Sequence, residues 1–198
     1  MNLPNKLTVL RIILSIVIIF ILLFPFHLVN VFFPKYLINE ILVVDSKYIL
    51  VGIIFVIASF TDFLDGYIAR KYNLITDFGK LMDAIADKIL VNSVLIILSS
   101  SNFINPIIPV IVIVRDSIVN SIKMVAASKG KVVAAINLGK IKTIFLMLGI
   151  TLTLFYNLPF ELWNINVSDF LLITAAILSL ISGIQYFVMN KKILFEKD

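Results

Sequence analysis

The sequence contains no cysteine and only one histidine, His27. The absence of cysteine excludes disulfide bonds, thiolate metal sites and cysteine nucleophiles. A Ser-His-Asp triad or a paired-histidine zinc site would have to be built around His27 alone, and we interpret this residue instead as solvated, near the outer end of a membrane segment. Charged residues are also scarce, at 15% of the chain. The few carboxylates are therefore the residues to examine for chemistry.

The most abundant feature is apolar sequence. Of the 198 residues, 61% are hydrophobic and the mean hydropathy is +1.08, whereas a soluble domain is about 45–50% apolar. This excess predicts a polytopic membrane protein. The net charge of +5 indicates basic residues on the cytoplasmic side of a membrane rather than nucleic-acid binding. The opening "MNLPNKLTVLR" does not resemble a cleavable signal peptide, because the apolar run after it is long and lacks a small-residue cleavage site.

We expect an all-α fold in which residues 1–198 form a single integral-membrane domain. The amphipathic opening "LPNKLTVLR" is predicted to form a short helix along the cytoplasmic interface. A membrane span requires about 20 mostly apolar residues, and we predict a kink at Pro25 in the first span and a start at Pro106 and Pro109 for the fourth. The six predicted transmembrane helices cover residues 9–33, 48–70, 80–100, 104–127, 140–158 and 169–190.

Lysine and arginine are distributed unevenly between the two sides of this arrangement. Outside loops hold only Lys35 and Lys47, and the positive-inside rule then places both termini in the cytoplasm. The inside segments hold Lys6, Arg11, Arg70, Lys71, Lys80, Lys123, Lys129, Lys131, Lys140, Lys142, Lys191, Lys192 and Lys197.

One short stretch concentrates negative charge where charge is costly. "TDFLDGYIARKYNLITDFGKLMDAIAD" occupies residues 61–87. Asp62 and Asp65 share a face of the second predicted span, at i and i+3, and Asp83 and Asp87 share a face of the third, at i and i+4. If the two spans form an antiparallel hairpin that turns near residue 75, the four carboxylates meet at similar depths on the cytoplasmic side.

Four close carboxylates repel one another by several kcal/mol per pair, roughly, unless protons or cations compensate. Few basic residues are expected at that depth, and oxygen-only ligands favour hard divalent ions such as Mg²⁺ or Mn²⁺. Two such ions typically serve phosphoryl displacement. The alternative is that the aspartates are interfacial charges at helix ends, an interpretation that we adopt for Asp77. Because Gly costs about 1 kcal/mol in a helix relative to Ala, Gly66 indicates a close approach of a ligand to the backbone.

Residues 62–87 read D-x2-D-G-x2-A-R-x8-G-x3-D-x3-D, which resembles the signature of the CDP-alcohol phosphatidyltransferases, integral-membrane enzymes of phospholipid synthesis. The resemblance implies two divalent cations, CDP-diacylglycerol as the lipid substrate, and a homodimer. It also implies that Asp87 acts as the general base. Asp62, Asp65, Asp83 and Asp87 would hold the metals, and Asp62, Gly66, Ala69, Arg70 and Gly79 would hold the cytidine diphosphate group.

The acceptor alcohol is suggested by a second group of charges. Arg115 interrupts the apolar fourth span, and Lys140 and Lys142 open the fifth in "GKIKT". These cations are suited to the phosphate of an anionic acceptor, and the pattern is similar to the family branch that uses sn-glycerol 3-phosphate. Related branches use phosphatidylglycerol, inositol phosphate, serine or choline-like acceptors. Arg115 and Asp116 are alternatively a structural ion pair, and the two lysines alternatively topology anchors.

Two residues of the opening segment, Thr8 and Arg11, fit either interfacial positions or the pocket. Two other classes of protein also use intramembrane aspartates. A cation transporter explains the acidic cluster but not the fixed positions of Gly66, Ala69 and Gly79. An aspartyl intramembrane protease needs only two aspartates and leaves the others without a role. Dependence on a divalent metal and release of CMP distinguish the transferase from both.

Overall fold

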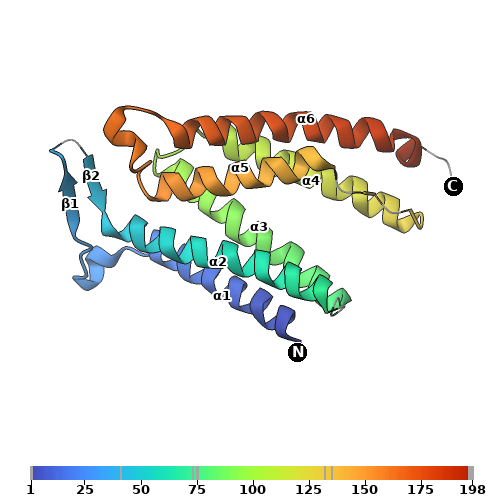
Figure 1. The fold of residues 1–198 in the computed structure, drawn as a ribbon, viewed down its shortest axis with the longest axis horizontal. Helices are drawn as coiled ribbons and strands as arrows, with labels where there is room; N and C mark the ends of the chain where they lie inside the picture. Colours follow the sequence, from blue (N-terminus) through green and yellow to red (C-terminus); the bar gives the residue numbers. More distant parts are fainter. Residues whose placement is uncertain are drawn as a thin grey trace.

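The computed structural model describes residues 2–40, 42–72, 74, 76–131, 133–134 and 136–195. Lys197 of the basic set lies outside these residues, as do the side chains of Lys80 and Lys192. The described chain is mostly helical (Figure 1). Its α-helices are α1 (Leu3–Leu23), α2 (Ser46–Lys71), α3 (Asp77–Ser100), α4 (Ile107–Ser128), α5 (Asn137–Leu154) and α6 (Val167–Phe195).

The first predicted span differs most from the structure. The opening residues do not form a separate interfacial helix, because α1 is one continuous helix from Leu3 to Leu23 with Pro4 in its first turn, where proline is tolerated. The span also does not reach residue 33: α1 ends before Pro25, whose ring disfavours a helical conformation in the residue before it. The chain then forms a 3₁₀ turn, η1 (Phe26–Val29).

The all-α prediction is therefore correct for the long helices but not for the segment after α1. Strands β1 (Lys35–Ile38) and β2 (Leu42–Asp45) pair antiparallel, with Lys35 opposite Asp45. Asp45 then caps α2, its side chain accepting a hydrogen bond from the backbone N–H of Lys47 over 2.8 Å. A second 3₁₀ turn, η2 (Phe160–Trp163), precedes α6 at the same end of the molecule (Figure 1).

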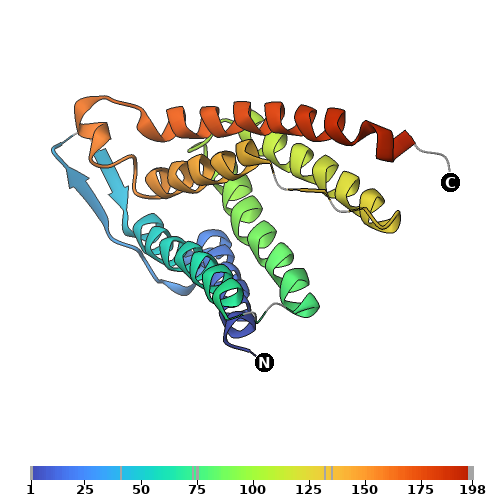
Figure 2. The ribbon, with the colours of Figure 1, turned by 45° about the vertical axis from the view of Figure 1, so that its right-hand side comes forward.

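The helices form two groups. Helices α4 and α5 both pack against α6, and Figure 2 shows α3 linking this group to α1 and α2. Helices α2 and α3 each pack mainly against α1. The prediction paired the second and third spans with each other as an antiparallel hairpin. In the structure, α1 lies against both of the helices that carry the aspartates, so the prediction is wrong about their main packing partner. This arrangement places residues of α1 at the acidic cluster.

Small residues allow the helices to approach closely at two crossings. A β-carbon on Gly52 would lie 3.1 Å from the ring of Phe155, and one on Gly149 would lie 2.8 Å from the Leu172 side chain. Glycine at such positions is typical of membrane helices, whose association depends on close packing. The buried core that these crossings enclose includes Ile18, Phe55, Leu95, Ile150 and Leu172.

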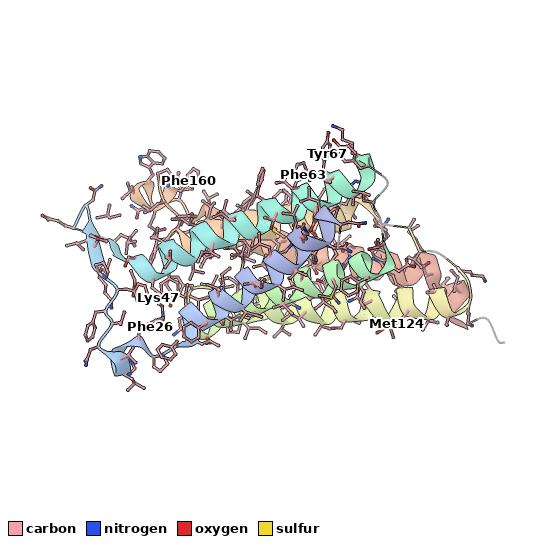
Figure 3. The ribbon with its side chains drawn as sticks, turned by 90° about the horizontal axis from the view of Figure 1, so that it is seen from below. Phe26, Lys47, Phe63, Tyr67, Met124 and Phe160 are labelled. Carbon is pink, nitrogen blue, oxygen red and sulfur yellow. The ribbon has the colours of Figure 1, made fainter. Side chains whose placement is uncertain are left out.

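The exterior is strongly apolar. In Figure 3, Phe63 and Tyr67 extend outward from α2 and Met124 from α4, and Met124 is 73% exposed. Within the described residues, four helices are long and apolar enough to cross a membrane: α1, α2, α5 and residues 167–191 of α6. Helix α3 carries Asp83, Asp87 and Lys88, and α4 carries Arg115, Asp116 and Lys123. These charges lower the apolarity of the two remaining predicted spans.

Candidate functional site

The acidic cluster forms where α2 and α3 meet α1. Asp62 and Asp65 lie one turn apart on α2, and Asp83 lies on α3. One carboxylate oxygen from each residue lies within 4.8 Å of the other two. The side chain of Asp65 is 6% exposed, that of Asp62 36% and that of Asp83 53%. The cluster is thus buried at Asp65 and open at Asp83, and three of the four predicted metal ligands converge.

A guanidinium group lies among these carboxylates. Arg11 of α1 is fully buried and forms ion pairs through Nη1 with Asp62 and through Nη2 with Asp65. Its Nη1 also donates to Asp83 Oδ1 over 3.1 Å. Thr8, one turn earlier on α1, donates from Oγ1 to Asp65 Oδ2 over 3.1 Å. The sequence-based expectation that basic residues are scarce at this depth is wrong at Arg11.

Thr8 and Arg11 therefore belong to the site. The sequence signal that indicates this is a polar stripe on an otherwise apolar helix. Asn5, Thr8, Arg11 and Ser15 recur at helical spacing, and all four are buried on the inner face of α1. A helix surrounded by lipid has no reason to bury four polar residues unless they meet polar partners.

A cavity of about 320 Å³ opens beside the cluster. Figure 1 shows the ends of α1, α2 and α3 that carry these lining residues at the end of the molecule remote from β1 and β2. Of the residues predicted to hold cytidine diphosphate, Asp62 does not line the cavity. The lining comprises the four other predicted residues, Gly66, Ala69, Arg70 and Gly79, together with Pro4, Asn5, Thr8, Asp65, Leu74, Thr76 and Asp83.

Glycine occurs at two positions of the cavity wall, residues 66 and 79, for different structural reasons. A β-carbon on Gly66 would meet only the Arg70 guanidinium, at 3.6 Å, an ordinary contact. A β-carbon on Gly79 would lie 2.6 Å from Asn5 Oδ1 and 3.0 Å from Thr76 Oγ1. Gly79 therefore allows α1 to approach α3, whereas the absence of a side chain at Gly66 leaves room in the cavity wall.

The start of α3 is tied to α1 through a small polar network. Thr76 is the N-cap of α3, and its Oγ1 accepts a hydrogen bond from the Gly79 N–H over 3.0 Å. The same Oγ1 accepts a hydrogen bond from Asn5 Nδ2 over 3.2 Å. Asn5 thus fixes the end of α3 that carries Asp83.

Asp87 stands apart from the three clustered carboxylates. It lies one turn beyond Asp83 on α3, is partly buried, and does not belong to the group whose oxygens lie within 4.8 Å of one another. Its carboxylate interacts electrostatically with the carboxylates of Asp62, Asp83 and Asp116. Asp87 therefore lies near both the cluster of Asp62, Asp65 and Asp83 and the charged cluster described next.

Arg115 and Lys142 converge on a shared carboxylate. Arg115 Nη1 donates to Asp116 Oδ1 over 2.8 Å, and Lys142 Nζ donates to both Asp116 oxygens over 2.9 and 3.1 Å. Arg115 Nη2 also donates to Ser182 of α6 over 2.9 Å. Lys142 is buried, with 4% exposure, whereas Lys140 is exposed. The structure thus brings two of the three predicted acceptor-binding cations together.

The chemistry of the first cluster fits a divalent cation. Three carboxylates and one guanidinium leave a net charge of −2 (−3 from Asp62, Asp65 and Asp83, +1 from Arg11). The donors are all hard oxygens, the type that Mg²⁺ and Mn²⁺ prefer. The open side at Asp83 provides access from the cavity.

Comparisons with known proteins agree over nearly the full chain. Residues 1–181 match the family model of the CDP-alcohol phosphatidyltransferases. The chain is similar to a Bacillus subtilis (strain 168) protein named CDP-diacylglycerol–glycerol-3-phosphate 3-phosphatidyltransferase, at 39% identity over 96% of this chain and 95% of that protein. Proteins of the same name from Rickettsia felis and Haemophilus influenzae are 33% and 34% identical, each over 96% of this chain and over 96% and 94% of their own lengths.

Proposed function

This chain belongs to the CDP-alcohol phosphatidyltransferase family, and from that membership we propose its specific reaction. It transfers the phosphatidyl group of CDP-diacylglycerol to a hydroxyl of sn-glycerol 3-phosphate and gives phosphatidylglycerol phosphate and CMP. The observation that carries this proposal is that relatives named for this acceptor match over 96% of the chain, while three carboxylates of the family motif converge in the fold.

The acidic cluster is the proposed metal site. Asp62, Asp65 and Asp83 hold two divalent cations, Mg²⁺ or Mn²⁺, and Asp87 completes the ligand set from the next turn of α3. When bound, such ions neutralise the diphosphate and stabilise the departing phosphate oxygen. The fit rests on the hard oxygen donors, on their mutual distances within 4.8 Å, and on the residual negative charge beside Arg11.

The cavity lined by Gly66, Ala69, Arg70 and Gly79 holds the cytidine diphosphate group. Gly66 has no side chain to separate the ligand from α2, and the exposed Arg70 guanidinium lies over it. A planar guanidinium is suited to bidentate binding of phosphate oxygens. The diacylglycerol tails remain among the membrane lipids, consistent with the apolar outer face of α2, where Phe63 is 64% exposed.

The acceptor binds on the other side of Asp87. Arg115 and Lys142, with Lys140 at the rim, hold its phosphate, and Asp116 and Ser182 orient the first two of these cations. Asp87 takes the proton of the attacking hydroxyl. The hydroxyl oxygen forms a bond to the phosphorus that bears diacylglycerol, the anhydride bond breaks, and CMP leaves with the bridging oxygen. Asp87 is suited to this role because it lies near both clusters.

The proposed setting is the cell membrane, with all six α-helices spanning it. Helices α3 and α4 extend alongside the four more apolar helices in Figure 1, and their outer faces are apolar, with Ile96 53% and Val110 59% exposed. The start of α1 and the end of α6 lie away from the β1–β2 hairpin (Figure 1), and the basic bias of the sequence supports a cytoplasmic position for that end and for the active site. As the family resemblance implies, we propose a homodimer.

The test is a release assay with purified protein, CDP-diacylglycerol, Mg²⁺ and a panel of alcohols. We expect CMP release with sn-glycerol 3-phosphate and none after chelation of the metal. Release with phosphatidylglycerol, inositol phosphate or serine instead would keep the chemistry and change the acceptor. Ion flux through reconstituted vesicles without CMP release would favour the transporter alternative. Light scattering of the purified protein in detergent measures the oligomeric state.

A further inference from the structure

Arg11 has no place in the family motif, yet it is the residue that contacts all three clustered aspartates. The side chain is 0% exposed and crosses from α1 to Asp62 and Asp65 on α2 and to Asp83 on α3. A buried guanidinium of this kind persists only where negative charge compensates it. Its neighbours on the buried face of α1, Thr8 and Ser15, are uncharged.

The three oxygens that Arg11 contacts are those that define the proposed metal site. Nη1 contacts Asp62 Oδ1 and Asp83 Oδ1, and Nη2 contacts Asp65 Oδ2. Asp65 Oδ2 also accepts the Thr8 hydroxyl. A carboxylate has room for several partners, but a cation placed among these oxygens would stand directly beside a fixed positive charge. Guanidinium and metal therefore compete for the same atoms.

Within the described residues, the hydrogen bonds and ion pairs of the Arg11 side chain all go to the three clustered aspartates. Its Nε is buried and has no hydrogen-bond partner among the described residues. In the described part of the chain, the carboxylates are therefore the polar groups that hold the guanidinium. When a divalent ion takes over these oxygens, nothing else in the described structure retains the guanidinium there.

We propose that Arg11 is a built-in counter-cation of the active site that exchanges with divalent metal. Without metal, it neutralises part of the charge of the three aspartates and fastens α1 to α2 and α3. Metal binding requires its displacement, so Arg11 lowers the metal affinity of the site. This proposal rests on the proposed function, because it takes the acidic cluster to be the metal site.

The test measures Mn²⁺ binding and thermal stability, not turnover. The variants are Arg11→Gln, which removes the charge, and Arg11→Lys, which keeps a charge that cannot reach all three carboxylates. Lys6→Gln is the matched control, since it removes a cation from the exposed face of the same helix. Binding is followed by the electron paramagnetic resonance signal of free Mn²⁺ in detergent-solubilised protein, and stability by melting in chelator and in Mn²⁺.

We expect Arg11→Gln to bind Mn²⁺ roughly tenfold tighter or more than the unmodified protein, because the competing cation is gone. Arg11→Lys should show an intermediate gain and Lys6→Gln no change. In chelator, Arg11→Gln should melt several degrees lower, and Mn²⁺ should raise its Tm by more than it raises that of the unmodified protein. If Arg11→Gln does not fold in chelator, Arg11→Lys carries the affinity comparison.

Equal or weaker Mn²⁺ binding by both Arg11 variants, with normal binding by the unmodified protein, would overturn the exchange and leave the proposed function intact. That result would mean that the guanidinium and the metals occupy the site together. If neither the unmodified protein nor either Arg11 variant binds Mn²⁺, the metal site itself is wrong, and the proposed function fails along with the exchange.

Discussion

Asn5 of α1 lies directly against the backbone of Gly79 of α3, so that a β-carbon at residue 79 would stand 2.6 Å from Asn5 Oδ1. Asn5 cannot move away freely, because its amide nitrogen donates to Thr76 Oγ1. Gly79, a residue of the family motif, therefore serves the packing of α1 against α3 as well as the cavity.

We expect Gly79→Ala to destabilise the protein by about 1–3 kcal/mol, the usual cost of adding a methyl group to a closely packed contact. The measurement is thermal unfolding in detergent. In an Asn5→Ala background the same substitution should cost less, since the tightest contact is gone. Equal costs in both backgrounds would show that the Asn5 contact does not set the requirement for glycine.

Gly66→Ala separates ligand binding from packing. The new β-carbon would meet only the Arg70 side chain, at 3.6 Å, so the substitution should not destabilise the protein and should stabilise α2 by up to about 1 kcal/mol. If cytidine diphosphate approaches α2 at this point, the KM for CDP-diacylglycerol should rise several-fold while the KM for the acceptor stays constant. An unchanged KM for the lipid would place the nucleotide away from Gly66.

The helices that carry the family motif were the most predictable part of the fold. The predicted spans 48–70 and 80–100 correspond to α2, Ser46–Lys71, and α3, Asp77–Ser100. Their apolar runs are interrupted by turn residues and capped by Asp45 and Thr76. The convergence of Asp62, Asp65 and Asp83 also followed from helical spacing, which determines the face on which a side chain lies.

The position of α1 was not predictable in the same way. Arg11 near the start of a span satisfies the positive-inside rule whether it faces lipid headgroups or the protein interior, and spacing along one helix does not determine which helices become neighbours. The β1–β2 hairpin was missed because the first predicted span extended to residue 33 and the residues after it, with Lys35 and Lys47, were assigned to an outside loop. Tertiary packing decided both features.

Lys142→Met tests the acceptor site. A charge-assisted hydrogen bond contributes about 1.5–3 kcal/mol, so its loss should raise the KM for sn-glycerol 3-phosphate roughly tenfold to a hundredfold. Lys140→Met is the matched control: Lys140 is exposed and should matter less. The KM for CDP-diacylglycerol should not change in either variant. A rise in the lipid KM alone would assign Lys142 to the nucleotide side.

The orientation of the chain can be tested with single cysteines, because the protein has none of its own. Lys35 lies on β1, and Lys71 and Lys191 lie at the other end of the molecule; all three are exposed. We expect a membrane-impermeant maleimide to label Lys35→Cys in intact cells and to label Lys71→Cys and Lys191→Cys only after permeabilisation. The reverse pattern would invert the membrane orientation, and labelling of all three in intact cells would contradict a common cytoplasmic end.

Asp87→Asn tests whether Asp87 acts as the general base while the other aspartates of the motif bind metal. Asparagine keeps the shape of the side chain and an oxygen ligand but does not accept a proton at neutral pH, so turnover should fall by about 10²–10⁴-fold, the usual contribution of a general base. Because asparagine still offers an oxygen ligand and Asp62, Asp65 and Asp83 are unchanged, Mn²⁺ and CDP-diacylglycerol should still bind. Asp169→Asn, an exposed charge in the first turn of α6, is the control and should leave turnover unchanged. Loss of Mn²⁺ binding in Asp87→Asn would make Asp87 chiefly a metal ligand. Full turnover would show that Asp87 takes no part in the reaction. Only a variant that binds both ligands and is inactive supports the role of Asp87 as the base.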